Sequence, residues 1–240
     1  MTFRQQLQMA VVGAAALLVA ACSEGPSPLV PTAPSAAAPQ PAPPPAEPTA
    51  RYQVTFAGAW TQGSHPQDFP SNPHFSRLVG GTHSASARFW AEGALASEGI
   101  KNMAERGQTQ PLDQEVEAAI AAGAAQRVLI GGALGAGTGS VVLEFEMSQA
   151  YPLVTLVTMV APSPDWFVGV TALPLFENGQ WVDERRIELV PWDAGTDGGS
   201  TFTSPDLVTT PREPVSRIVS APLSPGGQVT PLATFTFKRI

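Results

Sequence analysis

The chain has 240 residues, of which 13 are basic and 20 acidic, and its single cysteine has no partner for an intrachain disulfide. A formal net charge of −7 argues against a nucleic-acid partner, because such proteins present basic surfaces to phosphates. Hydrophobic residues make up 43% of the sequence, which is enough for the core of one or two domains.

The N-terminus combines one arginine, Arg4, with an apolar run over residues 9–21. This run is too short to span a bilayer as a helix, but it suits the apolar core of a signal peptide. It ends in small residues directly before Cys22 and resembles the lipobox of bacterial lipoproteins, in which the cysteine is lipidated and becomes the new N-terminus. We therefore predict a lipoprotein signal peptide over residues 1–21 and lipidation at Cys22. The alternative is an ordinary secretory signal with an incidental cysteine.

A proline-rich segment follows the cysteine. Residues 23–50 hold ten of the 25 prolines and no aromatic residue, so they cannot bury enough apolar surface to form a domain. Proline favours extended polyproline II, and at ~3.1 Å per residue such a segment reaches at most roughly 85 Å. We predict that residues 22–50 are a disordered tether. Through its lipid, this tether would attach the protein to the outer membrane of the bacterial cell envelope, facing the periplasm or the surface, because Ser23 stands where the inner-membrane retention signal would have Asp.

The remaining residues, 51–240, have the patterns of one mostly β domain. Apolar and polar residues alternate at 52–56, which predicts a half-buried strand, whereas the nearly continuous apolar run at 153–160 predicts a strand buried on both faces. Ser97 is placed to cap a short helix that Gly107 would end. Strands are predicted at 52–56, 141–147, 153–160, 167–175, 182–190 and 232–240, and helices at 97–106 and 112–122.

This order of elements favours a mainly β fold, an antiparallel β-sandwich with two short helical insertions. Sequence signatures of the common hydrolases and nucleotide-binding loops are absent. The glycine-rich stretch at 131–139 lacks the spacing of a phosphate-binding loop and is predicted to be a loop before a strand. His65, His74 and His83 lie in one loop-rich segment, and hydrogen-bonded structural roles are the simpler interpretation than zinc ligation.

Three aspartates are more informative. Asp193 and Asp197 stand four residues apart in a loop with three glycines, and Asp165 begins the strand after a proline-containing turn. Carboxylates in such a loop can direct their oxygens at one hard cation. The loop is not an EF-hand, because Ser204 occupies the position at which a bidentate Glu is needed. The alternative is that these aspartates form turns by bonding their own backbone.

Two longer segments in this region match a known family. The sequence Ala-Pro-Ser-Pro-Asp-Trp-Phe-Val-Gly at 161–169 and Pro-Trp-Asp-Ala-Gly-Thr-Asp-Gly-Gly at 191–199 occur in order. With Tyr52–Trp60, Gly80–His83 and the ending Phe237–Ile240, the chain resembles the spondin domain, the central module of F-spondin-type extracellular matrix proteins, over most of residues 51–240. The resemblance implies a C2-like antiparallel β-sandwich.

The resemblance also implies a Ca²⁺ site formed by Asp165, Asp193 and Asp197. The function that follows is a lipid-anchored, calcium-binding extracytoplasmic module that binds a protein or glycan partner, or contributes to envelope structure, without catalysis. One alternative is a metal-dependent hydrolase that uses the aspartates and a histidine with a metal-bound water. Another is calcium-dependent attachment of the domain itself to a phospholipid surface, which the negative net charge opposes at anionic membranes.

Overall fold

Strand β1 (Thr49–Ala59) shows how alternation in the sequence becomes one face of a core. The structure, a computed structural model, describes residues 48–240. In it, the side chains of Tyr52, Val54 and Phe56 are fully buried. β1 pairs in antiparallel fashion with β13 (Ala233–Arg239) on one side and with β5 (Thr138–Ser148) on the other, and β10 (Glu184–Leu189) completes a four-stranded sheet.

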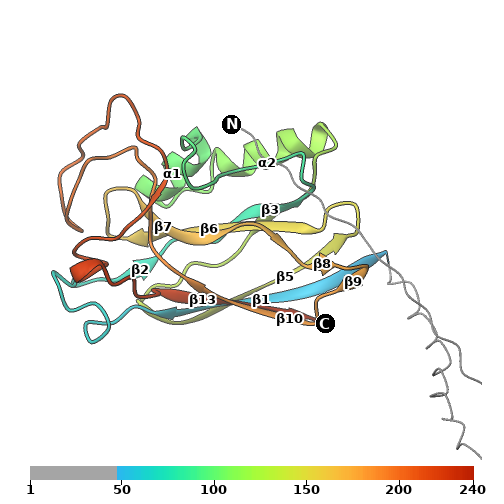
Figure 1. Ribbon diagram of the computed structural model, residues 1–240, viewed down its shortest axis with the longest axis horizontal. Coiled ribbons are helices and arrows are strands. Elements are labelled where there is room, and N and C mark those ends of the chain that lie inside the picture. Colours follow the sequence, from blue (N-terminus) through green and yellow to red (C-terminus); the bar gives the residue numbers. More distant parts are fainter. Residues whose placement is uncertain (1–47) are drawn as a thin grey trace, which may run out of the picture. The chain divides into compact units, whose positions relative to one another are not determined.

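A second, larger sheet packs against the first and is centred on β6 (Leu153–Ala161). β6 pairs with β7 (Trp166–Pro174) and with β3 (Val79–His83), and β4 (Ala125–Ile130) pairs with the other edge of β3. The short strands β2 (His74–Phe75), β11 (Trp192–Asp193) and β12 (Ser216–Arg217) extend this sheet, whereas β8 (Phe176–Glu177) and β9 (Gln180–Trp181) form a separate pair. Figure 1 shows the two sheets lying face to face as a β-sandwich.

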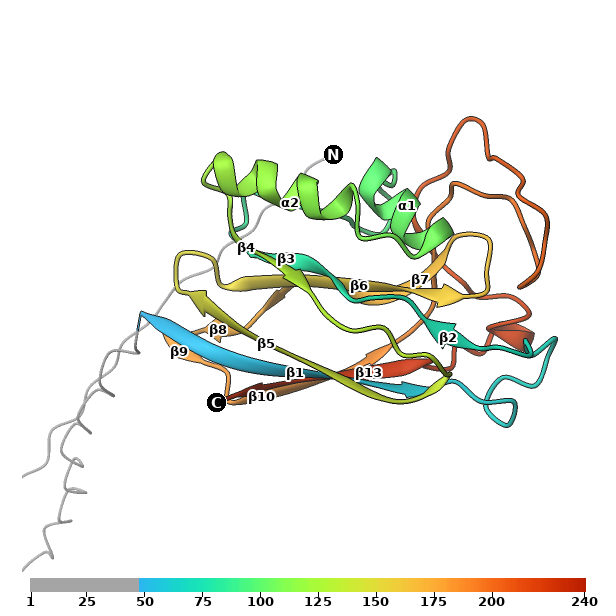
Figure 2. The same ribbon diagram turned by 180° about the vertical axis from the view of Figure 1, so that it is seen from behind.

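Two helices cover the outer face of the larger sheet (Figure 2). Ser97 caps the N-terminus of α1 (Glu98–Arg106), and its hydroxyl oxygen accepts a hydrogen bond from the amide of Ile100. Gly107 caps the C-terminus in the left-handed conformation, as predicted. In α2 (Leu112–Ala121), Glu115 joins the two helices, because its carboxylate accepts hydrogen bonds from the Ser97 hydroxyl and the Gly99 amide.

The molecule therefore has two hydrophobic cores that share one sheet. One core lies between the sheets and includes Phe56 and Phe235, and the other lies between the larger sheet and the helices and includes Ile100 and Met103. β6 contributes to both, with Leu156 facing one core and Val157 the other. This arrangement confirms the prediction of a strand buried on both faces, and it explains the uncharged sequence of β6.

The sandwich and all six predicted strands are confirmed, with boundaries that differ by a few residues. The stretch at 131–139 is a loop through residue 137, and β5 begins at Thr138. The sequence interpretation missed β3 and β4, and also the two-residue strands β2, β8, β9, β11 and β12. The signal peptide, Cys22 and residues 22–47 of the predicted tether lie outside the described part of the chain. Within residues 48–240, no helix is both long and apolar enough to span a membrane.

The close approach of β3 to β6 leads to a stability prediction. A Cβ atom at Gly80 would lie 2.0 Å from the carbonyl oxygen of Thr155, an overlap that only a backbone shift can relieve. We expect Gly80→Ala to reduce the free energy of unfolding by at least about 3 kcal/mol, measured by urea denaturation.

Gly135→Ala is the matched control, because no atom lies within 4 Å of the Cβ it would add. We expect this control to change stability by less than about 0.5 kcal/mol. Equal stabilities for the two variants would show that the β3–β6 contact is looser than the structure has it.

Candidate functional site

Pairing between β7 and β11 brings the two aspartate-containing segments together. Asp193 of β11 lies opposite Trp166 of β7, and Asp165 directly precedes Trp166 in the chain. The amide of Ala194 also donates a hydrogen bond to the carbonyl oxygen of Asp165, at 3.2 Å. The turn after β6 and the loop after β11 are therefore neighbours, as the prediction of a shared site requires.

Asp165 is the most deeply buried of the three aspartates, with a side chain that is fully inaccessible to solvent. Its Oδ2 atom accepts hydrogen bonds from the amides of Thr196 (2.7 Å) and Asp197 (3.0 Å) and from the Thr196 hydroxyl (3.2 Å). Its Oδ1 atom is buried and has no hydrogen-bond partner among the described residues. Burial, followed by the negative charge of Asp193, raises the pKa of Asp165 to about 7.

Asp193 and Asp197 each form a turn with their own backbone. Oδ1 of Asp193 accepts a hydrogen bond from the amide of Gly195, and Oδ1 of Asp197 accepts one from the amide of Gly199, both at 2.7 Å. Oδ2 of Asp197 accepts a further hydrogen bond from the Leu207 amide at 3.0 Å. The turn-forming interpretation of these two aspartates is therefore correct. It leaves room for a cation, because a carboxylate has about four lone-pair sites.

The electrostatic environment of Asp193 resembles that of Asp165. Burial raises the pKa of Asp193, and the negative charges of Glu213 and Asp197 act in the same direction. Hydrogen bonds from the Gly195 amide and from the Trp166 side chain partly oppose this shift. Two neighbouring carboxyl groups thus both resist ionisation, which is the condition that a bound cation would reverse.

Glycine is required at two places in this loop. Gly195 has φ +73°, and a Cβ there would lie 2.1 Å from the carbonyl oxygen of Glu213. At Gly199, a Cβ would lie 2.6 Å from a ring carbon of Pro164. The close approach at Gly199 holds the loop against the turn that carries Asp165, and that at Gly195 holds it against the segment that contains Glu213.

The arrangement fits a cation only if most ligands are not acidic side chains. Within residues 48–240, no three His, Cys, Asp or Glu side chains converge closely enough to hold a metal by themselves. Calcium takes six to eight oxygen ligands, and backbone carbonyls and water commonly supply part of the set. The unpartnered Oδ1 of Asp165, next to a second carboxylate, is the feature that suits a cation.

The three histidines lie apart and are engaged elsewhere. The ring nitrogens of His65 contact the Ser64 hydroxyl and the Thr230 carbonyl, and those of His83 contact the Ser84 carbonyl and the Thr155 hydroxyl. Nδ1 of His74 contacts the carbonyl oxygen of Asn72. None of these hydrogen bonds reaches the aspartates, so the histidines have the structural roles that were the simpler interpretation.

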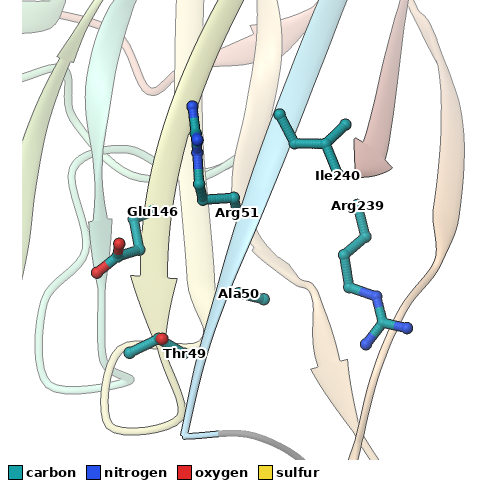
Figure 3. A pocket seen from close by; sticks show the side chains of 6 residues that line it. All are labelled: Thr49, Ala50, Arg51, Glu146, Arg239 and Ile240. Carbon is teal, nitrogen blue, oxygen red and sulfur yellow. The ribbon is translucent and has the colours of Figure 1, made fainter.

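A cavity of about 550 Å³ lies at the other end of β1, and Figure 3 shows its six lining residues. Its charged side chains already have partners. Arg51 pairs with Glu144, Arg239 pairs with Asp183, and Glu146 pairs with Arg127. This cavity is therefore a weaker candidate for ligand binding than the aspartate site.

Sequence reasoning did not identify two residues that shape the site. Thr196 binds Asp165 through both its amide and its hydroxyl, and Arg217 lies over the ring of Trp192, 5.2 Å from its centroid. Thr196 stands between the two aspartates of the loop, so its position was a usable signal. Arg217 follows the loop by 18 residues, and only the pairing of β11 with β12 places it there.

Comparisons with known proteins identify the family to which the domain is similar. The Spondin_N family model matches residues 50–227. Spondin-2 of Rattus norvegicus is 36% identical over 208 residues, which cover 81% of this chain and 63% of that protein. Spondin-2 of Homo sapiens is 38% identical over 176 residues, which cover 72% of this chain and 53% of that protein. Spondin-1 of Mus musculus is 35% identical over 212 residues, which cover 80% of this chain and 25% of that protein. The chain thus spans less than two thirds of the length of these relatives.

The raised pKa of Asp165 predicts a pH-dependent stability in metal-free protein. The folded state holds this proton up to about pH 7, whereas the unfolded carboxyl releases it near pH 3.8. The free energy of unfolding should therefore fall as the pH rises from 4 to 7, by up to roughly 4 kcal/mol from this group, since one pKa unit corresponds to about 1.4 kcal/mol.

Asp165→Asn isolates this contribution, because the amide oxygen can keep the hydrogen bonds made to Oδ2. We expect the stability difference between wild type and variant, from urea denaturation in EGTA at pH 4–8, to change in favour of the variant as the pH rises. Glu117→Gln, on the exposed side of α2, should follow the wild type. Parallel curves for the wild type and Asp165→Asn would contradict the prediction.

Proposed function

The chain belongs to the Spondin_N family, and on that premise we propose that it is a non-catalytic binding module held outside the cytoplasm by an N-terminal lipid and containing one calcium ion. Spondin-1 and Spondin-2 are the relatives that support an extracytoplasmic role in binding or adhesion. A partner of this module would be a protein or a glycan.

One observation carries the calcium proposal. Oδ1 of Asp165 is a buried carboxylate oxygen without a partner among the described residues, and a second carboxylate, Asp193, lies near enough to raise the pKa of Asp165. Buried charges in proteins are normally paired or coordinate a metal. A cation between these two carboxylates would supply the missing partner, with Asp197, carbonyl oxygens and water completing the coordination.

The absence of catalysis is part of the proposal. The aspartates have no histidine among their hydrogen-bond partners, and a metal-bound water would need a positioned base to become a hydrolytic nucleophile. The site is better suited to holding loops in place and presenting an ion than to proton transfer.

Calcium should stabilise the folded protein through this site. At a free concentration one hundred times the Kd, an ion that binds only the folded state adds about 2.7 kcal/mol to the free energy of unfolding. We expect calcium to raise the melting temperature of the wild type, and Asp165→Asn and Asp193→Asn to lose most of this rise.

Glu117→Gln removes the same charge from α2 and should keep the full response to calcium. Scanning calorimetry with and without EGTA, together with calcium titration by isothermal calorimetry, measures both effects. If calcium shifts the melting temperature of the wild type and of both aspartate variants equally, the ion does not bind here.

Lipidation at Cys22 accounts for the attachment. We expect the wild type to sediment with membranes and to be released by detergent, whereas Cys22→Ala should appear in the soluble fraction after ultracentrifugation. An unchanged membrane-bound fraction in Cys22→Ala would rule out the lipid anchor.

A further inference from the structure

A cavity of about 240 Å³ opens beside the aspartate site. Trp166, Asp193 and Gly199 line one part of it, and residues 216–221 line the other. This places the carboxylate of Asp193 at the border between the buried aspartates and a space that a ligand can enter. The volume is that of an amino-acid side chain or a single sugar ring rather than a larger molecule.

Arg217 gives this cavity an unpaired positive charge. It lines the cavity and lies over the ring of Trp192, which keeps the guanidinium close to the surface of β11. None of the ion pairs formed within residues 48–240 includes Arg217. A guanidinium in this position can bind a carboxylate through two parallel hydrogen bonds.

An ion bound by Asp193 would lie next to the same cavity, because Asp193 is the one of the three aspartates that lines it. The loop amides already use Oδ2 of Asp165, Oδ1 of Asp193 and both oxygens of Asp197. Because calcium needs six to eight oxygens, a ligand oxygen that enters past Asp193 can replace water on the ion. Without the ion, Asp193 would repel an anion. With the ion, the cavity would present two positive groups.

Most side chains that line the cavity are polar, but one exposed apolar side chain favours a protein ligand over a sugar. Val219 lines the cavity and is 57% exposed. Leu207 and Val208, which do not line the cavity, are 60% and 72% exposed, and the Leu207 amide is bonded to Asp197. An exposed apolar side chain at a polar pocket is typical of a protein interface, whereas a sugar would leave Val219 in water.

We propose that this cavity receives the side-chain carboxylate of an aspartate or glutamate from a partner protein, which binds Arg217 and the calcium ion together. This inference rests on the proposed calcium site. The exposed Val219 would then form an apolar contact beside the inserted acidic side chain.

The test is thermodynamic coupling between calcium and a carboxylate probe, because each must raise the affinity of the other by the same factor. Calcium is titrated into the purified protein by isothermal calorimetry, alone and with 50 mM N-acetyl-aspartate amide, with free calcium measured by electrode. The neutral N-acetyl-asparagine amide and the sugar acid galacturonate are the comparison probes. We expect only the aspartate probe to lower the apparent Kd of calcium, by about threefold or more.

Two arginine variants separate the proposal from a general charge effect. Arg217→Gln should bind calcium alone like the wild type but lose the enhancement, whereas Arg186→Gln, an exposed arginine on β10, should keep it. Calcium binding without any enhancement by the aspartate probe would overturn the carboxylate site and leave the calcium site standing. A stronger effect of galacturonate would overturn the assignment to a protein partner. A protein that binds no calcium would fail at the proposed function instead.

Discussion

Burial of β6 on both faces is the constraint on which the rest of the structure depends. One face of this strand packs into the core between the sheets and the other into the core beneath the helices, so it can neither slip in register nor carry a charge without losing one core. The strand ends at Ala161, and the turn that follows contains Asp165. The position of the buried carboxylate is therefore set by a strand that is packed into both cores.

The two carboxylate oxygens of Asp165 differ in their hydrogen bonding. Through Oδ2, Asp165 holds the amides of Thr196 and Asp197, which joins the loop after β11 to the turn after β6. Its other oxygen is buried without a partner among the described residues, and an unpaired buried charge costs several kcal/mol unless it takes up a proton or a cation. The loop is thus organised around a carboxyl group that is neutral when it holds a proton and would be charged when it holds a cation.

The sequence predicted the elements that depend on residues close together in the chain, but not the features that depend on pairing between distant segments. Alternation located β1 and β13, and the Ser97 cap and Gly107 located α1, because each signal lies within a few residues. β3 was missed because its two glycines, Gly80 and Gly81, lower strand propensity although the close approach of neighbouring atoms requires them. The lack of a hydrogen-bond partner for Oδ1 of Asp165 among the described residues, and the position of Arg217, depend on strand pairing. No local sequence pattern reveals this pairing.

The length of β1 separates the point where the chain enters the domain from the aspartate site. The amide of Ile240, the last residue, is bonded to Arg51 near the start of β1, while Trp60, just past its end, contacts Phe202 beside the aspartate site. Eleven extended residues span roughly 36 Å, and Figure 2 shows the start of β1 and the site-bearing loops at opposite poles of the domain. A partner molecule that contacts these loops would therefore leave the start of β1, where the polypeptide enters the domain, uncovered.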